Sequence, residues 1–142
     1  MYRVVIDPGV LISALLSPHG HPASLYLRWR AGDFELIVSP ALLDELQRVL
    51  NRPRFRAHVT PEEANRYVDV LRREAIVAQD PPDPPRVSRD QKDDYLIALA
   101  RLGRAHYLVS GDRDLTDLAD PGPPILTPRE FVAVLDRETQ SR

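Results

Sequence analysis

Short apolar runs alternate along this chain with longer segments in which apolar residues recur at helical spacing. The short runs are rich in β-branched residues and predict strands at 4–6, 34–38, 75–78, 106–109 and 124–126. The longer segments predict helices over 10–16, 22–30, 40–50 and 61–74, from Asp90 or Asp93 to Leu102, from 127 to 137, and a short one ending at Leu118. Strands that alternate with helices favour a parallel sheet covered on both faces, an α/β/α sandwich.

Turn and cap signals separate these elements. A hydroxyl residue followed by proline, a good N-cap and first helical residue, begins three of the helices, at 39–40, 60–61 and 127–128. Asp7-Pro8-Gly9 is interpreted as a turn that stops the first strand. The segment 80–90 holds four of the 14 prolines and is predicted to be a loop, too short for a linker between domains.

Composition places the chain among globular proteins. Its 142 residues, 43% hydrophobic and 28% charged, predict a single domain spanning 1–142. No apolar run approaches the roughly 20 residues of a membrane helix, no secretory leader is recognised, and there is no cysteine, so a cytoplasmic location is expected. The net charge of -2 argues against coating of nucleic acid by bulk charge, although a local basic patch stays possible.

Polar side chains follow the predicted strands at the point where each one ends. Asp7 follows the first strand and Ser39 the second, while Ser110 and Asp112 follow the strand at 106–109. In open α/β sheets, the ligand crevice lies outside the carboxyl ends of the strands. The sequence therefore brings carboxylates and hydroxyls from three strands to the same edge of the sheet.

Two predicted helices add further acids to this edge. In the helix 40–50, Glu45 lies at the margin of the apolar arc, whereas Asp44 is on the opposite side and is expected to face water. The pair Asp93 and Asp94 opens a helix that is apolar nearly all round, so its first turn is expected to point into the protein. Periodicity does not choose between these two acids, and acids in a first turn also favour the helix dipole without any further role.

Together, these acids indicate a metal site more strongly than any one of them alone. Taken alone, each acid also has an interpretation without function. Asp7 could be only a turn residue, Asp112 only a helix N-cap, and Glu45 only a surface acid beside Arg48. Converging carboxylates repel one another unless a cation lies among them, and an all-oxygen set without cysteine favours Mg²⁺ or Mn²⁺. Such a cation supports the hydrolysis of phosphodiesters. The four histidines show no ligand spacing and are interpreted as structural or surface residues.

Four motifs then resemble those of the PIN-domain nucleases, and most closely the branch of toxin components of toxin–antitoxin modules. They read Val-Ile-Asp-x-x-Val-Leu-Ile-Ser-Ala-Leu at 5–15, Val-Ser-Pro-Ala-Leu-Leu-Asp-Glu-Leu at 38–46, Asp-Asp-Tyr-Leu-Ile-Ala-Leu-Ala at 93–100 and Leu-Val-Ser-Gly-Asp-Arg-Asp-Leu at 108–115. Each motif alone is weak, but all four stand in the family's order and at its spacing. The resemblance covers almost the whole chain.

The resemblance implies a Mg²⁺- or Mn²⁺-dependent endoribonuclease whose acidic quartet is catalytic and binds the metal. Carried over position by position, the quartet is Asp7, Glu45, Asp94 and Asp112. Supporting positions are Ser39, Asp93, Ser110 and Asp114. The resemblance also implies a homodimer and a protein antitoxin that blocks the groove.

One motif departs from the family, which usually has Asp-Thr-Asn-Val where this chain has Asp7-Pro8-Gly9-Val10. The missing threonine removes a hydroxyl and the missing asparagine an amide that normally helps to organise the site. The alternative function is therefore a PIN-like domain with a compromised site that binds RNA or a protein partner without cleaving. A basic run with an aromatic residue, Arg52-Pro53-Arg54-Phe55-Arg56, is a candidate RNA contact, but such runs are also common as solvated loops.

Two other enzyme classes fit the residues poorly. A phosphatase that uses Asp7 as its nucleophile, in the manner of the haloacid dehalogenase-like enzymes, requires an acid at position 9, where this chain has glycine. A receiver domain requires a lysine at a late strand end, and the only lysine, Lys92, precedes a helix.

Overall fold

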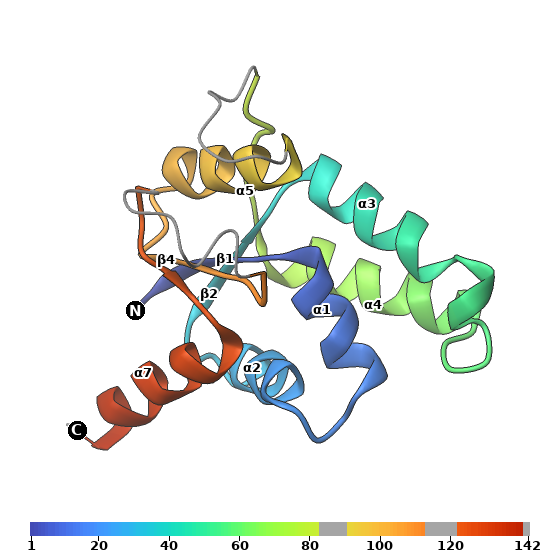
Figure 1. The fold of residues 1–142 in the computed structure, drawn as a ribbon, viewed down its shortest axis with the longest axis horizontal. Helices are drawn as coiled ribbons and strands as arrows, with labels where there is room; N and C mark the ends of the chain where they lie inside the picture. Colours follow the sequence, from blue (N-terminus) through green and yellow to red (C-terminus); the bar gives the residue numbers. More distant parts are fainter. Residues whose placement is uncertain (83–90, 113–121, 141–142) are drawn as a thin grey trace.

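The computed structural model describes residues 1–82, 91–112 and 122–140, which form a parallel sheet with helices on both sides (Figure 1). The strands are β1 (Arg3–Ile6), β2 (Glu35–Val38), β3 (Ile76–Val77), β4 (Tyr107–Val109) and β5 (Ile125–Leu126). The helices are α1 (Pro8–Leu16), α2 (His21–Arg30), α3 (Pro40–Leu50), α4 (Pro61–Glu74), α5 (Gln91–Leu102) and α7 (Pro128–Gln140), with a 3-10 turn at Pro53–Phe55. This architecture confirms the predicted α/β/α sandwich.

The sheet has the order β3-β2-β1-β4-β5, and every pair of neighbours is parallel. In the central strand, Val5 lies opposite Ile37 of β2 and Leu108 of β4. Helix α5 packs over β1 and β4, while α1, α2 and α7 lie on the other side (Figure 1). Since all strands run the same way, the ends of β1, β2 and β4 meet at one edge of the sheet.

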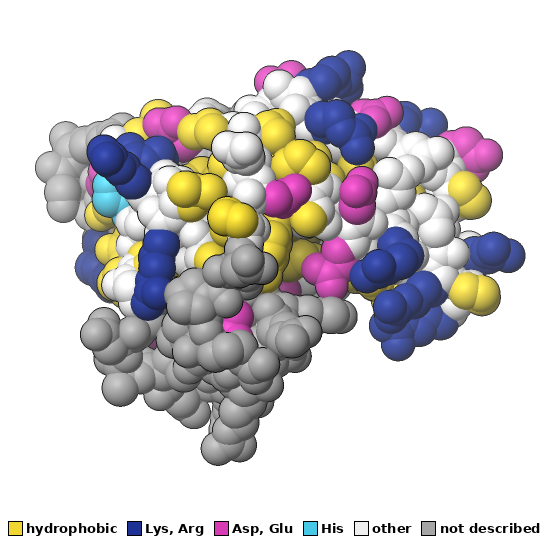
Figure 2. Space-filling view, turned by 90° about the horizontal axis from the view of Figure 1, so that it is seen from above, with side chains coloured by type: hydrophobic (Ala, Val, Ile, Leu, Met, Phe, Trp, Pro, Cys, Tyr) yellow, Lys and Arg dark blue, Asp and Glu magenta, His cyan; other side chains and the backbone are white. Residues whose placement is uncertain are grey.

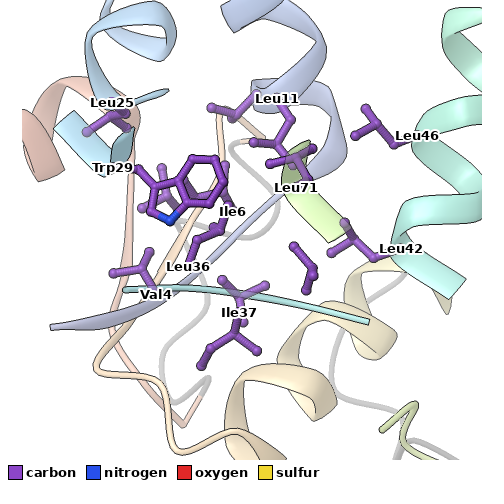
Figure 3. Close-up of a cluster of buried hydrophobic side chains, with 14 of the residues drawn as sticks. Val4, Ile6, Leu11, Leu25, Trp29, Leu36, Ile37, Leu42, Leu46 and Leu71 are labelled. Atoms are coloured by element: carbon purple, nitrogen blue, oxygen red, sulfur yellow. The ribbon is translucent and has the colours of Figure 1, made fainter. Parts of the chain in front are cut away.

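The core explains why the strands read as continuous apolar runs. Side chains of β1 and β2 meet apolar residues of the surrounding helices, among them Leu11, Trp29 and Leu46 (Figure 3). Val4, Val5 and Val38 have no exposed surface, because both faces of the central strands are covered. A sheet covered on both faces leaves only its edges for polar function.

The first strand passes into a helix more directly than the sequence predicted. Pro8 and Gly9 are the first residues of α1, and the Asp7 side chain caps this helix by accepting a hydrogen bond from the Gly9 N–H at 2.9 Å. The interpretation of residues 7–9 as a free turn was therefore wrong. An aspartate cap followed by proline is a helix start, since proline at the first position loses no hydrogen bond that the helix requires.

The three helix starts predicted from a hydroxyl residue followed by proline agree with the structure, in which α3, α4 and α7 begin at Pro40, Pro61 and Pro128. Helix α5 begins at Gln91, so Asp93 lies inside the helix and is not its cap, and Asp90 lies outside the described residues. Ser39 caps α3, and Thr60 forms a capping box with Glu63 at the start of α4. The predicted short helix ending at Leu118 and most of the loop 80–90 lie outside the described residues. No helix in the described part of the chain is both long enough and apolar enough to cross a lipid bilayer.

Candidate functional site

Ser110 links the acids that follow β1 and β4. Its hydroxyl donates a hydrogen bond to Oδ2 of Asp7 at 3.0 Å and accepts one from the backbone N–H of Asp112, also at 3.0 Å. Ser110 is fully buried, so this arrangement is fixed by the end of β4. The other oxygen of Asp7 accepts from the Gly9 N–H at 2.9 Å. Both oxygens of Asp7 are thus oriented by the protein.

A pocket of about 690 Å³ opens at this edge of the sheet. It is lined by acids from four segments together with one arginine and an apolar wall: Asp7, Pro8, Gly9, Ile12, Ala41, Asp44, Glu45, Arg48, Val49, Asp93, Tyr95, Leu96 and Asp112. The space-filling view shows Asp and Glu side chains gathered near arginine side chains on the upper face of the molecule (Figure 2). The strand-end acids and the helix acids therefore share one cavity.

Helix α3 contributes two acids to the pocket. Glu45 is half-buried, in agreement with its position at the margin of the apolar arc, and Asp44 is exposed. The expectation that Asp44 lies on the opposite side was nevertheless incomplete, because Asp44 also lines the pocket. A helical wheel describes positions around the axis but not how the helix is tilted over the pocket mouth.

The acid pair at the start of α5 is buried, as its apolar helix predicted. Asp93 is 5% exposed and Asp94 is 2% exposed. Asp93 lines the pocket, whereas Asp94 is not among the lining residues. The acid that the family resemblance selects thus lies deeper than its neighbour.

The pKa of Asp7 is raised above its ordinary value. The main cause is burial, and the charges of Glu45 and Asp112 add to it, while the hydrogen bonds from Gly9 and Ser110 act in the opposite direction. The raised pKa means that the charged form of Asp7 is less favourable in the pocket than in water, and a cation in the pocket would offset this effect.

The donor chemistry of the pocket fits a hard divalent cation. Within the described ranges, no three acidic or imidazole side chains stand close enough to form a preformed metal cage. Mg²⁺, however, is commonly bound through one or two carboxylates, with water and substrate phosphate as its other ligands. Asp7 supplies an oriented carboxylate, and both Glu45 and Asp112 act electrostatically on it from the same pocket.

Ser39 has a different place from the one expected at a strand end. It is fully buried and is not among the pocket-lining residues. Its hydroxyl accepts from Leu42 N–H at 3.2 Å and is hydrogen-bonded to the Tyr95 hydroxyl, which in turn donates to Asp80 at 2.5 Å. Asp80 also accepts from the backbone N–H of Ala41 at 3.2 Å. We call this linkage of Ser39, Tyr95 and Asp80 the α3–α5 junction.

The α3–α5 junction holds together the two helices that bring acids to the pocket. Burial alone raises the pKa of Asp80, but hydrogen bonds from Tyr95, Ser39 and Ala41 outweigh burial, so the pKa is lowered overall. The pKa of Tyr95 is raised, by burial and by its bond to Asp80. Sequence reasoning missed this linkage, and its only signal was a tyrosine in an otherwise apolar helix.

The basic run after α3 is folded rather than a loose loop. Pro53–Phe55 forms a 3-10 turn, and the exposed Arg54 guanidinium lies over the Phe55 ring at 4.7 Å from its centroid. Arg52 and Arg56 are also exposed, and none of the three predicted arginines lines the pocket. The pocket arginine is instead Arg48, one turn earlier, which sequence reasoning noted only as a neighbour of Glu45. Asp114 lies outside the described residues.

Residues 3–114 match the family model described as PIN domain. The chain is 28% identical over 146 residues to the uncharacterized protein MJ1680 of Methanocaldococcus jannaschii, covering 95% of this chain and 92% of the relative.

Solved structures show the same fold at low identity. PAE2754 from Pyrobaculum aerophilum superposes with a TM-score of 0.65 at 16% identity, covering 96% of this chain and 90% of that one. VapBC2 from Rickettsia felis, bound to a DNA fragment from its promoter, superposes with a TM-score of 0.59 at 12% identity. The match covers 88% of this chain and 98% of that one. A domain of a functionally unknown protein from Methanocaldococcus jannaschii superposes with a TM-score of 0.55 at 19% identity. The match covers 88% of this chain and 89% of that one.

The family match covers more than three quarters of the chain and includes every acid that lines the pocket. The sheet order and the acids at the carboxyl edge of the sheet are features of the structure itself and do not depend on the family match. On this evidence the chain belongs to the PIN domain family, whose members are generally nucleases.

Proposed function

We propose that this protein is a divalent-metal-dependent endoribonuclease that hydrolyses RNA phosphodiesters. The observation that supports this proposal best is the convergence of Asp7, Glu45, Asp93 and Asp112 on one pocket at the carboxyl edge of the sheet. Carboxylates crowded into one pocket favour a site for a bound ion over a purely structural role.

In this proposal, Asp7, Asp112 and Glu45 would hold the ion, with Asp94 as the fourth acid implied by the family resemblance. When bound, a divalent cation lowers the pKa of water and stabilises the charge that develops on the phosphate. Glu45, on the α3 side of the pocket, also orients the attacking water. The water oxygen bonds to phosphorus in line with the leaving 3′ oxygen, and the products carry a 5′-phosphate and a 3′-hydroxyl.

Ser110 acts through Asp7 rather than on the substrate. Its hydroxyl donates to one carboxylate oxygen of Asp7 and leaves the carboxylate fixed toward the pocket. Partners of this kind orient ligating carboxylates, and their loss typically reduces metal affinity or activity by about 10–100-fold.

The test is cleavage of a labelled single-stranded RNA with Mn²⁺ by the wild type, Asp93→Asn and Asp94→Asn. We expect Mn²⁺-dependent cutting that chelation abolishes and that at least one of the two variants loses. Asp69→Asn is the matched control, because Asp69 is an exposed acid on α4 that pairs with Arg72 outside the pocket. Cutting that persists in EDTA, or in both pocket variants, would refute the metal-dependent mechanism.

The alternative, binding without cleavage, is favoured by Pro8 and Gly9 in the first motif. Among the described residues, a Cβ added at Gly9 would meet Asp7 Oδ1 at 3.5 Å, which is ordinary contact. The backbone at Gly9 therefore has room for the first side-chain atom of Gly9→Asn, which restores the family's usual residue. A rise in cleavage by Gly9→Asn over an inactive wild type would assign the wild type to the binding class.

We extend the proposal to partners of this chain. The family resemblance implies a toxin role, a homodimer and a protein antitoxin that covers the pocket. Leu27 of α2 is 65% exposed and is a candidate residue for contact with a second copy. Sedimentation of the wild type and Leu27→Glu tests the dimer: we expect the variant to shift toward monomer, and identical sedimentation would remove this face from the proposal.

A further inference from the structure

Arg48 gives the acidic pocket a positive charge on one side. It is an exposed residue of α3, and it is the basic side chain among the described residues that line the pocket. Glu45 lies three positions earlier in α3 and lines the same pocket. Residues three apart are neighbours on a helix surface, so the acid and the guanidinium face the same cavity.

The guanidinium of Arg48 has no protein partner in the described part of the chain. Asp44 precedes it by four positions, a spacing and order that favour an ion pair on a helix. The ion pairs among the described residues nevertheless join Arg28 with Asp33 and Asp136, and Arg72 with Asp69. Arg48 is also absent from the described hydrogen bonds, and its charge is available to a ligand.

The position of Arg48 suits a ligand that carries several negative charges in a row. An RNA strand approaching the acids meets repulsion, which a cation relieves only where it is bound. Arg48 offers a second positive charge on the wall next to those acids, and arginine binds phosphate through two parallel hydrogen bonds. Arg52, four positions on and beyond the end of α3, is a further exposed arginine near this end of the helix.

We infer that Arg48 binds a phosphate of the RNA strand beside the acidic pocket and so positions the strand for cleavage. This inference rests on the proposed nuclease function for the identity of the ligand. It assigns to Arg48 the role in substrate binding that the sequence suggested for the run Arg52, Arg54 and Arg56.

The inference is tested by binding, separately from cleavage. A fluorescein-labelled single-stranded RNA is titrated in EDTA with Asp7→Asn, in which one repelling carboxylate is removed, and with Asp7→Asn combined with Arg48→Gln. Loss of one phosphate contact on single-stranded nucleic acid reduces the slope of log K against log salt by about 0.7. We expect that reduction, with binding weakened by roughly five- to tenfold at low salt, which corresponds to about 1–1.4 kcal/mol.

Two further variants make the result specific. Arg104→Gln removes an exposed arginine that precedes β4, at the opposite edge of the sheet, and should leave both the slope and the affinity unchanged. Arg48→Lys should retain most of the slope because the charge remains. An unchanged slope in Arg48→Gln, or an equal loss in Arg104→Gln, would overturn the inference. A wild type that never cuts RNA while Arg48 still sets the salt slope would refute the nuclease proposal alone.

Discussion

Two aspartates near the same edge of the sheet, Asp7 and Asp80, have opposite environments. Asp80 accepts hydrogen bonds from the Tyr95 hydroxyl and from the Ala41 N–H, and its pKa is lowered. Asp7 also accepts two hydrogen bonds, but it is more deeply buried and shares its pocket with Glu45 and Asp112, so its pKa is raised.

The contrast between Asp7 and Asp80 separates an acid that stabilises the fold from an acid that is a candidate for ion binding. The carboxylate of Asp80 is stabilised by the folded protein and in turn fixes the α3–α5 junction. The folded protein raises the pKa of Asp7, so a cation or another positive ligand in the pocket would stabilise the charge of its carboxylate. Hydrogen bonding alone does not distinguish the two, whereas the balance of burial and neighbouring charge does.

The largest effect is expected on activity at Asp7. Asp7→Asn keeps the size of the side chain but removes its charge, so RNA cleavage with Mn²⁺ should fall by about 10²–10³-fold, given the several kcal/mol that a metal ion supplies. The stability of the metal-free protein should stay the same or rise, because a disfavoured charge is lost. Initial rates and urea unfolding measure the two quantities. A variant that cleaves normally would place Asp7 with Asp80 among the structural acids.

Metal binding should stabilise the protein through the pocket of Asp7 and not through Asp80. At a free Mn²⁺ concentration 100-fold above the dissociation constant, the wild type should gain about 2.7 kcal/mol against unfolding. Asp7→Asn should gain much less, and Asp80→Asn should gain nearly as much as the wild type. Thermal unfolding with and without Mn²⁺ checks this. Equal gains in all three proteins would mean that the ion binds elsewhere.

Loss of Asp80 should act mainly on stability. Asp80→Ala leaves the Ala41 N–H and the Tyr95 hydroxyl without this acceptor, which costs about 1–3 kcal/mol. Asp80→Asn, which keeps an acceptor oxygen, should cost less. Urea unfolding gives both values, and Asp69→Ala on the surface of α4 is the control. An Asp80→Ala variant as stable as the wild type would show that the α3–α5 junction does not hold the helices.

The smallest and most discriminating effect is the sign of the pH dependence without metal. Asp7 has a raised pKa, so its contribution to stability is present below the unfolded pKa near 3.8 and is lost as pH rises through the folded pKa. Asp80 has a lowered pKa, so its contribution is present above that value and is lost as pH falls through its folded pKa.

The two asparagine variants should therefore diverge with pH. Relative to the wild type, Asp7→Asn gains stability between pH 3 and pH 7, while Asp80→Asn loses stability over the same range. Urea unfolding at several pH values in EDTA measures both differences. Parallel curves would remove the contrast between the two acids.

The sequence predicted most of the fold because its signals are local. Apolar runs such as Val4-Val5-Ile6 mark strands buried on both faces, and caps such as Thr60 mark where helices begin. Parallel topology then places Asp7 and Asp112 at one edge without any further information. The start of α1 was missed because Asp7-Pro8-Gly9 fits a turn and a helix cap equally well in sequence.

The parts of the site that were not predicted depend on contacts between distant segments. Whether Asp93 or Asp94 lines the pocket depends on how α5 is rotated over β1 and β4, which its nearly uniform apolar surface does not specify. The α3–α5 junction joins residues that are 15 and 56 positions apart. Arg48 enters the pocket for the same reason as Asp44, through the tilt of α3.

Anomalous diffraction of crystals soaked in Mn²⁺ shows directly whether the pocket binds a metal ion. We expect a peak in the pocket, within ligating distance of Asp7 and of at least one further acid among Glu45, Asp93, Asp94 and Asp112. A peak beside Asp80, or no peak in the pocket at saturating Mn²⁺, would contradict this expectation.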